Sequence, residues 1–123
     1  MNENAVMDCF HRGQILAATI PSSCQDNLAW VGVYPLDLSR QTTVEFLRNH
    51  GLTVLPNAES AYHIRTFEVR QQLIDADASI AEQHMTNKNS YFAFGDDDLQ
   101  KKMRALGVNI ESLDLPFKSD YPI

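Results

Sequence analysis

The sequence predicts an α+β fold, with one globular domain over residues 1–123 and a mixed or antiparallel sheet of about four to five strands accompanied by two to four helices. Three observations lead to this prediction. Short apolar runs rich in β-branched and aromatic residues are interspersed with segments of helical spacing. Isolated glycines and prolines separate these segments. The 123 residues, 44% of them hydrophobic, suffice for one continuous core.

The first segment predicts a short helix in residues 1–12. Val6, Cys9 and Phe10 recur there at helical spacing, and Gly13 opposes a continuation of the helix. The sequence alone leaves open whether this segment is ordered.

A β-hairpin is expected next. Residues 14–20 and 28–34 are apolar runs, and the polar stretch 21–27 separates them as a turn would. The second run has the aromatic and β-branched content of an interior strand, and Pro35 is expected to stop it.

A helix and a short strand are predicted after the hairpin. Ser39 offers an N-cap, and Gly51 stands where a left-handed residue would follow the helix. The apolar face of this helix consists of Val44, Phe46 and Leu47. Residues 52–55 then predict a short strand, so that 28–55 would form one strand, helix and strand unit.

The middle of the chain predicts a strand over residues 62–69 and a helix over about 71–86. The apolar residues of the helix recur at Leu73, Ile74, Ile80, Ala81 and Met85. Residues 77–79 interrupt this pattern, and Ser79 with Glu82 has the spacing of a capping box. Two short helices are therefore the alternative.

A turn, a strand and a well-marked helix are predicted near the end. Residues 87–89 predict the turn, and 90–94 predict an aromatic strand that Gly95 ends. Acids begin the helix and bases occupy its later turns, which suits the helix dipole, and Gly107 ends it. Its apolar face consists of Leu99, Met103 and Leu106. Residues 108–123 are expected to form an ordered tail packed on the body.

The charge balance narrows the class of partner. The chain has 16 acids and 10 bases, a formal net charge of −6, which opposes direct binding to nucleic acid or anionic lipid and favours a basic partner or simple solubility. The first residues carry acid where a signal peptide would carry base, and no apolar run approaches the ~20 residues of a membrane span. A cytoplasmic protein is expected. Cys9 and Cys24 are expected to be free thiols.

Acidic residues are the candidates for partner contact. Three consecutive acids, Asp96 to Asp98, could meet a cation or an arginine cluster, but the same residues would also cap a helix N-terminus. Asp75 and Glu82 would lie on one helix face, where a solvated surface is the alternative to steering of a cationic partner. Tyr121 is the aromatic residue expected outside the core. The predicted partner-binding residues are Asp96, Asp97, Asp98, Asp75, Glu82, Asp120 and Tyr121.

No catalytic motif stands out, and neither a cofactor nor a metal site is predicted. The five glycines are isolated, so a phosphate-binding loop has no support. An enzyme or metal protein that uses Cys9, His11 or His63 is the competing hypothesis, because such side chains can meet only in the fold.

Three stretches, LAWVGVYP (28–35), YFAFGDDDL (91–99) and LPFKSDYPI (115–123), resemble segments of small bacterial immunity proteins encoded beside contact-dependent growth inhibition toxins. The resemblance implies a cytosolic protein that binds the C-terminal domain of its cognate toxin, often a nuclease, and blocks its active site or substrate access. It assigns no contact residues. The chain is expected to be a monomer or a weak homodimer, in which strand 90–94 would pair with its own copy at a sheet edge.

Overall fold

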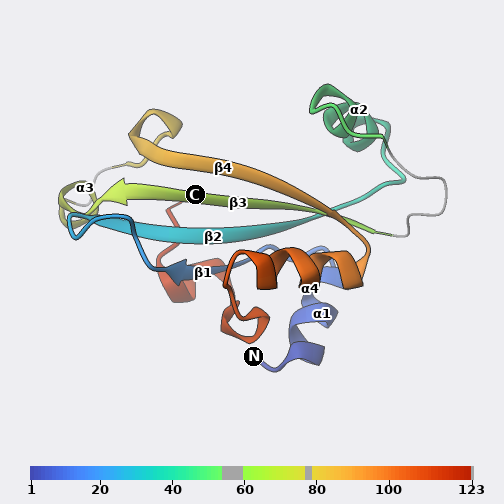
Figure 1. Ribbon diagram of the computed structural model, residues 1–123, viewed down its shortest axis with the longest axis horizontal. Helices are drawn as coiled ribbons and strands as arrows, with labels where there is room; N and C mark the ends of the chain where they lie inside the picture. The colour runs from blue at the N-terminus through green and yellow to red at the C-terminus, as the bar shows by residue number, and fades with distance from the viewer. Residues whose placement is uncertain (54–59, 77–78, 123) are drawn as a thin grey trace.

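The protein has an α+β fold built on a four-stranded antiparallel sheet. The computed structural model describes residues 1–53, 60–76 and 79–122. The strands follow one another in the sheet in chain order, as a meander (Figure 1). They are β1 (Leu16–Ile20), β2 (Asn27–Leu36), β3 (Ala61–Arg70) and β4 (Met85–Phe94). The predicted fold class is confirmed, and of the two sheet types the sequence left open the structure has the antiparallel one.

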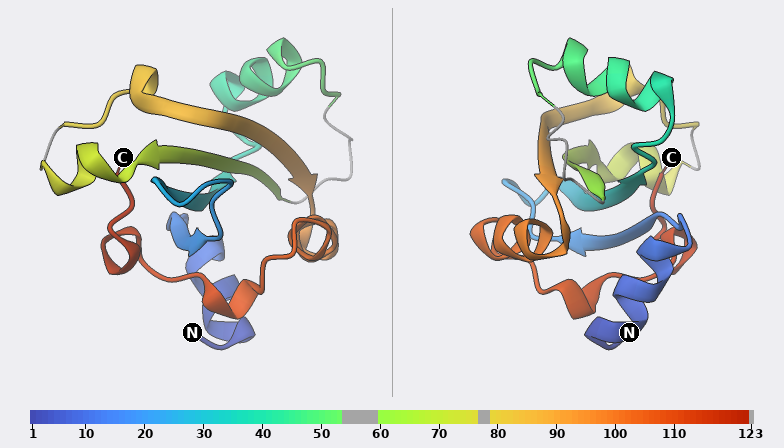
Figure 2. Two further views of the ribbon diagram at one scale, coloured as in Figure 1. Left: turned by 60° about the vertical axis from the view of Figure 1, so that its left-hand side comes forward. Right: turned by 90° about the vertical axis from the view of Figure 1, so that its right-hand side faces the viewer.

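Helices and short turns connect or flank these strands. The α-helices are α1 (Glu3–His11), α2 (Gln41–Asn49), α3 (Gln71–Asp75) and α4 (Asp96–Ala105). Three 3-10 turns are η1 (Glu82–His84), η2 (Ile110–Ser112) and η3 (Pro116–Ser119). Figure 2 shows α1, α4 and η2 on one side of the sheet and α2 on the other.

The larger core lies between the sheet and the layer formed by α1, α4 and the tail. Alternate residues of the strands point into it, and α1 contributes the three residues predicted to line its apolar side. The first segment is therefore an ordered helix. The buried members of this core include Val6, Cys9, Phe10, Leu16, Val31, Val33, Tyr62, Ile64, Leu99, Met103 and Leu113.

A smaller core lies on the opposite face, and the C-terminal tail completes it. Asp114 pairs with Ala17 of β1 through two backbone hydrogen bonds of 2.9 and 3.0 Å, so the tail runs along the β1 edge. The indole N–H of Trp30 then donates to the Ser119 carbonyl at 2.8 Å. The expected ordered tail is thus confirmed for residues 108–122, and it lies on both faces of the sheet.

Two local predictions around β2 are wrong. Pro35 does not end β2, which continues to Leu36. The reason is that β1 pairs only as far as Val33, so beyond it β2 has one neighbour, and a proline is tolerated where one side of a strand is open. Ser39 does not cap α2, because its N–H and hydroxyl both donate to Asp37.

The connection after α2 follows the prediction in part. Gly51 has the expected positive φ of 75° and ends the helix. Leu52 and Thr53 are not in a strand, and the rest of the predicted strand 52–55 lies outside the described residues.

The long helix predicted over 71–86 is wrong. α3 ends at Asp75, η1 is a separate turn, and β4 already begins at Met85, which pairs with Val69. Met85 and Thr86, predicted to be helical, therefore pair with β3 instead. Leu73, Ile74 and Ile80 pack against the smaller core from short segments and not from one long helix. The predicted interruption at 77–79 lies mostly outside the described residues.

The turn predicted at 87–89 is also wrong. These residues belong to β4, where Asn87 has a positive φ of 49° and the pairing with β3 shifts register between Thr66 and Glu68. The turn-like composition therefore marks an irregularity in an edge strand.

Candidate functional site

The acids at the start of α4 are used within the fold, with one exception. Asp96 accepts hydrogen bonds from the Tyr62 hydroxyl at 2.6 Å, from His11 Nε2 at 3.0 Å and from Ser60 at 3.4 Å. Burial raises the pKa of Asp96, but these hydrogen bonds outweigh burial and leave the pKa below its ordinary value. Asp96 therefore neither caps the helix, whose N-cap Gly95 makes no side-chain hydrogen bond, nor faces a cation site; it ties α4 to β3 and α1.

Asp98 has a similar structural task. It accepts the Phe94 N–H at 3.0 Å and lies 3.4 Å from the Lys102 ammonium one turn later. Asp97, between these two acids, is exposed. Of the three acids, only Asp97 makes no side-chain hydrogen bond or ion pair among the described residues.

The other predicted acids lie on different elements. Asp75 is exposed at the end of α3, and Asp120 is exposed after η3 with a positive φ of 54°. Glu82 lies in η1, so the prediction that Asp75 and Glu82 share a helix face is wrong. The helix that would have aligned them ends at Asp75.

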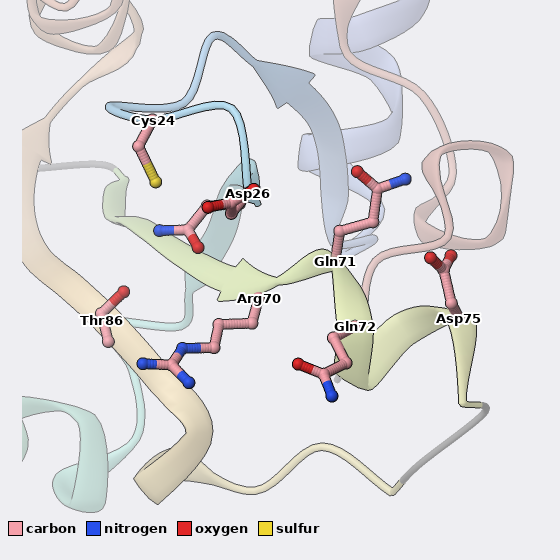
Figure 3. A pocket seen from close by; sticks show the side chains of 8 residues that line it. Cys24, Asp26, Arg70, Gln71, Gln72, Asp75 and Thr86 are labelled. Carbon is pink, nitrogen blue, oxygen red and sulfur yellow. The ribbon is translucent and has the colours of Figure 1, made fainter.

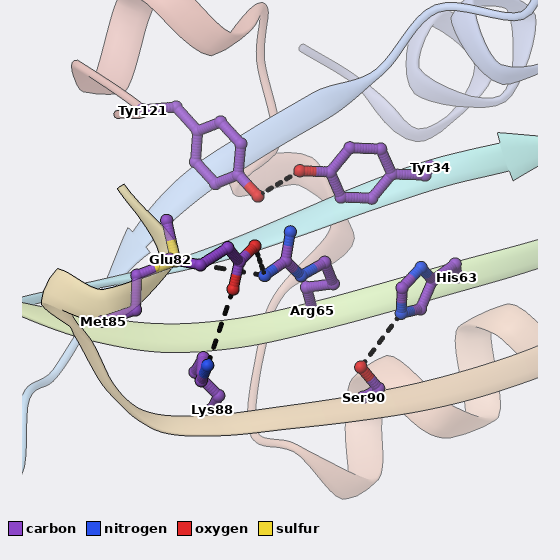
Figure 4. Close-up of polar contacts among 8 residues, drawn as sticks. All are labelled: Tyr34, His63, Arg65, Glu82, Met85, Lys88, Ser90 and Tyr121. Atoms are coloured by element: carbon purple, nitrogen blue, oxygen red, sulfur yellow. Dashed lines mark hydrogen bonds and ion pairs between the residues drawn. The ribbon is translucent and has the colours of Figure 1, made fainter. Parts of the chain in front are cut away.

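Glu82 is paired with two cations on the face of the sheet that carries the smaller core (Figure 4). Its carboxylate lies 2.7 Å from the Arg65 guanidinium and 3.6 Å from the Lys88 ammonium. The Arg65 side chain, 21% exposed, lies over the Phe67 ring. Hydrogen bonding to Arg65 is the main reason why the pKa of Glu82 is below its ordinary value.

Tyr121 is buried, which corrects the expectation that it lies outside the core. Its exposed fraction is 9%, and its ring packs against Phe67 with 5.5 Å between ring centroids. Its hydroxyl is 2.5 Å from the Tyr34 hydroxyl, and burial with this contact raises its pKa. A Cβ at Gly32 would overlap the Tyr121 ring, so the tyrosine needs a glycine beneath it.

His63 continues this polar surface along β3 (Figure 4). It stacks on Phe92 with an interplanar angle of 6°, and its Nε2 lies 3.0 Å from the Ser90 hydroxyl. Burial, with the nearby charge of Arg65, lowers the pKa of His63 to about 4, so the imidazole is neutral near pH 7.

We name this surface the β3–β4 strip. It consists of His63, Arg65, Glu82, Lys88 and Ser90. Sequence reasoning selected Glu82 as a partner-binding residue and His63 only for the competing enzyme or metal-protein hypothesis, and it missed Arg65, Lys88 and Ser90. The spacing of His63, Arg65 and Phe67 at every second residue was the signal that they share one face of a strand.

The residues of the competing hypothesis do not converge. Cys9 is buried in the larger core, and His11 on the same helix contacts Asp96. His63 lies with Tyr34 and Phe92 on the opposite face of the sheet. Cys9 and Cys24 are free, as predicted. Within residues 1–53, 60–76 and 79–122, no group of three or more His, Cys, Asp or Glu side chains could hold a metal ion.

No described helix is long and apolar enough to cross a bilayer. Comparison of the chain with protein families, curated proteins and solved structures found no match.

Proposed function

We propose that this chain is an immunity protein, which binds a basic toxin domain of the nuclease class and blocks its active site or its access to substrate. The resemblance of residues 28–35, 91–99 and 115–123 to such proteins supplies the class of partner. The observation that carries the proposal is the open edge of the sheet at β4, where residues 86–90 are all exposed.

The two edges of the sheet differ in a way that favours a partner at β4. At the β1 edge, the tail residue Asp114 pairs with Ala17 and occupies backbone groups of the strand. Among the described residues, none pairs with the outer side of β4. An edge strand of this kind presents backbone donors and acceptors to a second molecule. Its side chains from Thr86 to Ser90 are polar, which keeps the free protein in solution.

Beside this edge, the β3–β4 strip offers side chains already held in place. Glu82 fixes Arg65 and Lys88, and the Ser90 hydroxyl fixes His63. Groups that are ordered before binding lose less conformational entropy when a partner arrives. Hydrogen bonding at the edge and preordered polar groups beside it together suit a specific protein interface.

Net charge contributes mainly to the approach of the partner, before the two proteins touch. The net charge of −6 attracts a basic partner over long range, and Asp75, Asp97 and Asp120 are acids that remain exposed. Because these three lie on separate elements, the proposal assigns them to steering and assigns the contact to β4.

The direct test uses the toxin domain encoded beside this chain. We expect that domain to stop bacterial growth when it is produced alone, and growth to resume when the two are produced together. The proposal fails if the two proteins are both made in soluble form and growth stays inhibited.

Matched variants locate the contact. The double substitution Asn89→Lys and Ser90→Lys places cations on the β4 edge, where they would repel a basic partner, and should weaken protection, whereas Thr19→Lys, exposed on the β1 strand, should not. Equal protection by both variants would place the contact elsewhere. If the free protein is a dimer by size-exclusion chromatography, and only Asn89→Lys with Ser90→Lys makes it a monomer, the edge pairs with a second copy instead.

A further inference from the structure

A polar cavity of about 670 Å3 lies at the end of the sheet opposite α2 (Figure 3). The β1–β2 loop, the end of β3, α3 and the start of β4 form its walls. Its volume lies in the range of sites that bind small molecules. Its charged groups are the guanidinium of Arg70 and the carboxylates of Asp26 and Asp75, and amides, a hydroxyl and the Cys24 thiol complete the lining.

The loop that lines this cavity is held by a buried carboxylate. Glu68 is only 8% exposed and has no cationic partner among the described residues. It accepts hydrogen bonds from the Ser23 N–H and hydroxyl at 3.0 and 2.9 Å, from Asn27 at 3.2 Å and from Asn87 at 2.8 Å. A buried charge without a counter-ion is costly. Here that cost is offset by bonds that order the loop before any ligand arrives.

The guanidinium of Arg70 is available to a ligand. Arg70 is exposed, and the ion pairs found among the described residues do not include it. Figure 3 shows its side chain reaching across the cavity toward Thr86, away from Asp75. A planar guanidinium binds a carboxylate through two parallel hydrogen bonds, which gives both affinity and orientation.

We propose that this cavity binds a basic amino acid, either free or at the C-terminus of a polypeptide. The ligand's carboxylate binds the Arg70 guanidinium, and its cationic nitrogens lie near Asp26 and Asp75. The Gln72 amide can hydrogen-bond to either the carboxylate or a cationic nitrogen. The carboxylate and the two cationic nitrogens of a free basic amino acid match the three charged groups of the lining, and a C-terminal basic residue supplies the carboxylate and one of the two cations. The inference stands on the cavity alone and is independent of any toxin.

Calorimetry and alkylation of Cys24 test this site together. The probes are L-lysine, L-arginine and the tripeptide Gly-Gly-Lys, with norleucine and cadaverine as matched molecules that lack the side-chain cation and the carboxylate. We expect saturable binding of at least one probe, and slower alkylation of exposed Cys24 by iodoacetamide when the probe is present. Buried Cys9 is the internal control. Binding of the amino acids or of the tripeptide alone identifies which source the site accepts.

Variants make the test decisive. Arg70→Met should weaken binding at least about tenfold, because a charge-assisted pair of hydrogen bonds is lost. Asp75→Asn should weaken the basic probes but leave norleucine unchanged, and Arg48→Met on α2 should change nothing. Thermal unfolding midpoints confirm that each variant is folded. The proposal is overturned if none of the three probes binds saturably, if norleucine and cadaverine bind as well as lysine, or if Arg70→Met and Asp75→Asn, both folded, bind lysine normally.

Discussion

Tyr62, the second residue of β3, donates a 2.6 Å hydrogen bond to Asp96, the first residue of α4. The same carboxylate also contacts His11 at the end of α1. One side chain therefore joins the sheet to both helices that cover the larger core. The first aspartate of the acidic run therefore has a structural role, because it holds the sheet and the two helices together.

Removing the tyrosine hydroxyl tests this joint. Tyr62→Phe should lower the free energy of unfolding by about 1 to 2 kcal/mol, since a part-buried hydrogen bond to a charged group is lost. Urea denaturation measures the change. Tyr91→Phe is the control, because this half-buried tyrosine of the adjacent strand makes no side-chain hydrogen bond among the described residues. Equal losses for the two variants would contradict the account.

The effect of Tyr62→Phe should depend on pH in one direction. The pKa of Asp96 is lowered from the ordinary value of 3.8 in the folded protein, so its ionised form contributes stability above that value. This contribution is lost as the pH falls through the lower pKa of the folded state. The stability difference between wild type and Tyr62→Phe should therefore shrink in acid. A difference that grows on acidification would refute this role.

Gly32 and Tyr121 should prove to be energetically coupled. A methyl group at Gly32 would overlap the Tyr121 ring, so Gly32→Ala should destabilise the protein by about 1 to 3 kcal/mol through overpacking. In the background of Tyr121→Ala the same substitution should cost less, because the ring is gone. A double-mutant cycle with urea denaturation measures the coupling. Additive effects would show that the ring can move away.

The imidazole of His63 should lose its positive charge at a pH well below that at which histidine usually does. Its pKa of about 4, against an ordinary 6.5, means that between these values the unfolded chain binds a proton that the folded chain does not. Stability therefore rises with pH across this window and is lost on acidification. An NMR titration of the His63 ring measures the pKa directly, and His63→Gln should remove this part of the pH dependence. Titration near 6.5 would be inconsistent with the stacked, half-buried ring.

Glu68 should control the order of the loop that lines the polar cavity. Glu68→Gln replaces an acceptor for Ser23, Asn27 and Asn87 with a group that also donates, so bonds are lost and the loop loosens. We expect faster hydrogen exchange at the Ser23 amide. Exposed Glu111→Gln is the control and should leave that rate unchanged. Unchanged exchange in Glu68→Gln would mean that other contacts hold the loop.

Predictions from sequence succeeded where the signal was local. Helices α1 and α4 have their apolar spacing, their charges and their terminal glycines within one segment, and the hairpin of β1 and β2 needs only its own turn. The helix predicted over 71–86 failed because Met85 pairs with Val69 of another strand, and no pattern inside the segment reports that partner.

The candidate site was less predictable for the same reason. Tyr121 looks exposed in a polar terminal stretch, but it is buried because Gly32, far away in the chain, leaves room for its ring. Glu82 was selected for its charge, and its partners Arg65 and Lys88 become visible only in the fold. Charge counted along a sequence therefore says little about which acids remain free.

The proposed role of β4 can be measured directly by hydrogen–deuterium exchange of this chain, with and without the proposed cognate toxin domain. Binding at the edge should slow exchange of amides in residues 86–90 and leave those of β1 unchanged. Slowed exchange confined to β1 or the helical layer, or none at a concentration that saturates binding, would contradict the assignment.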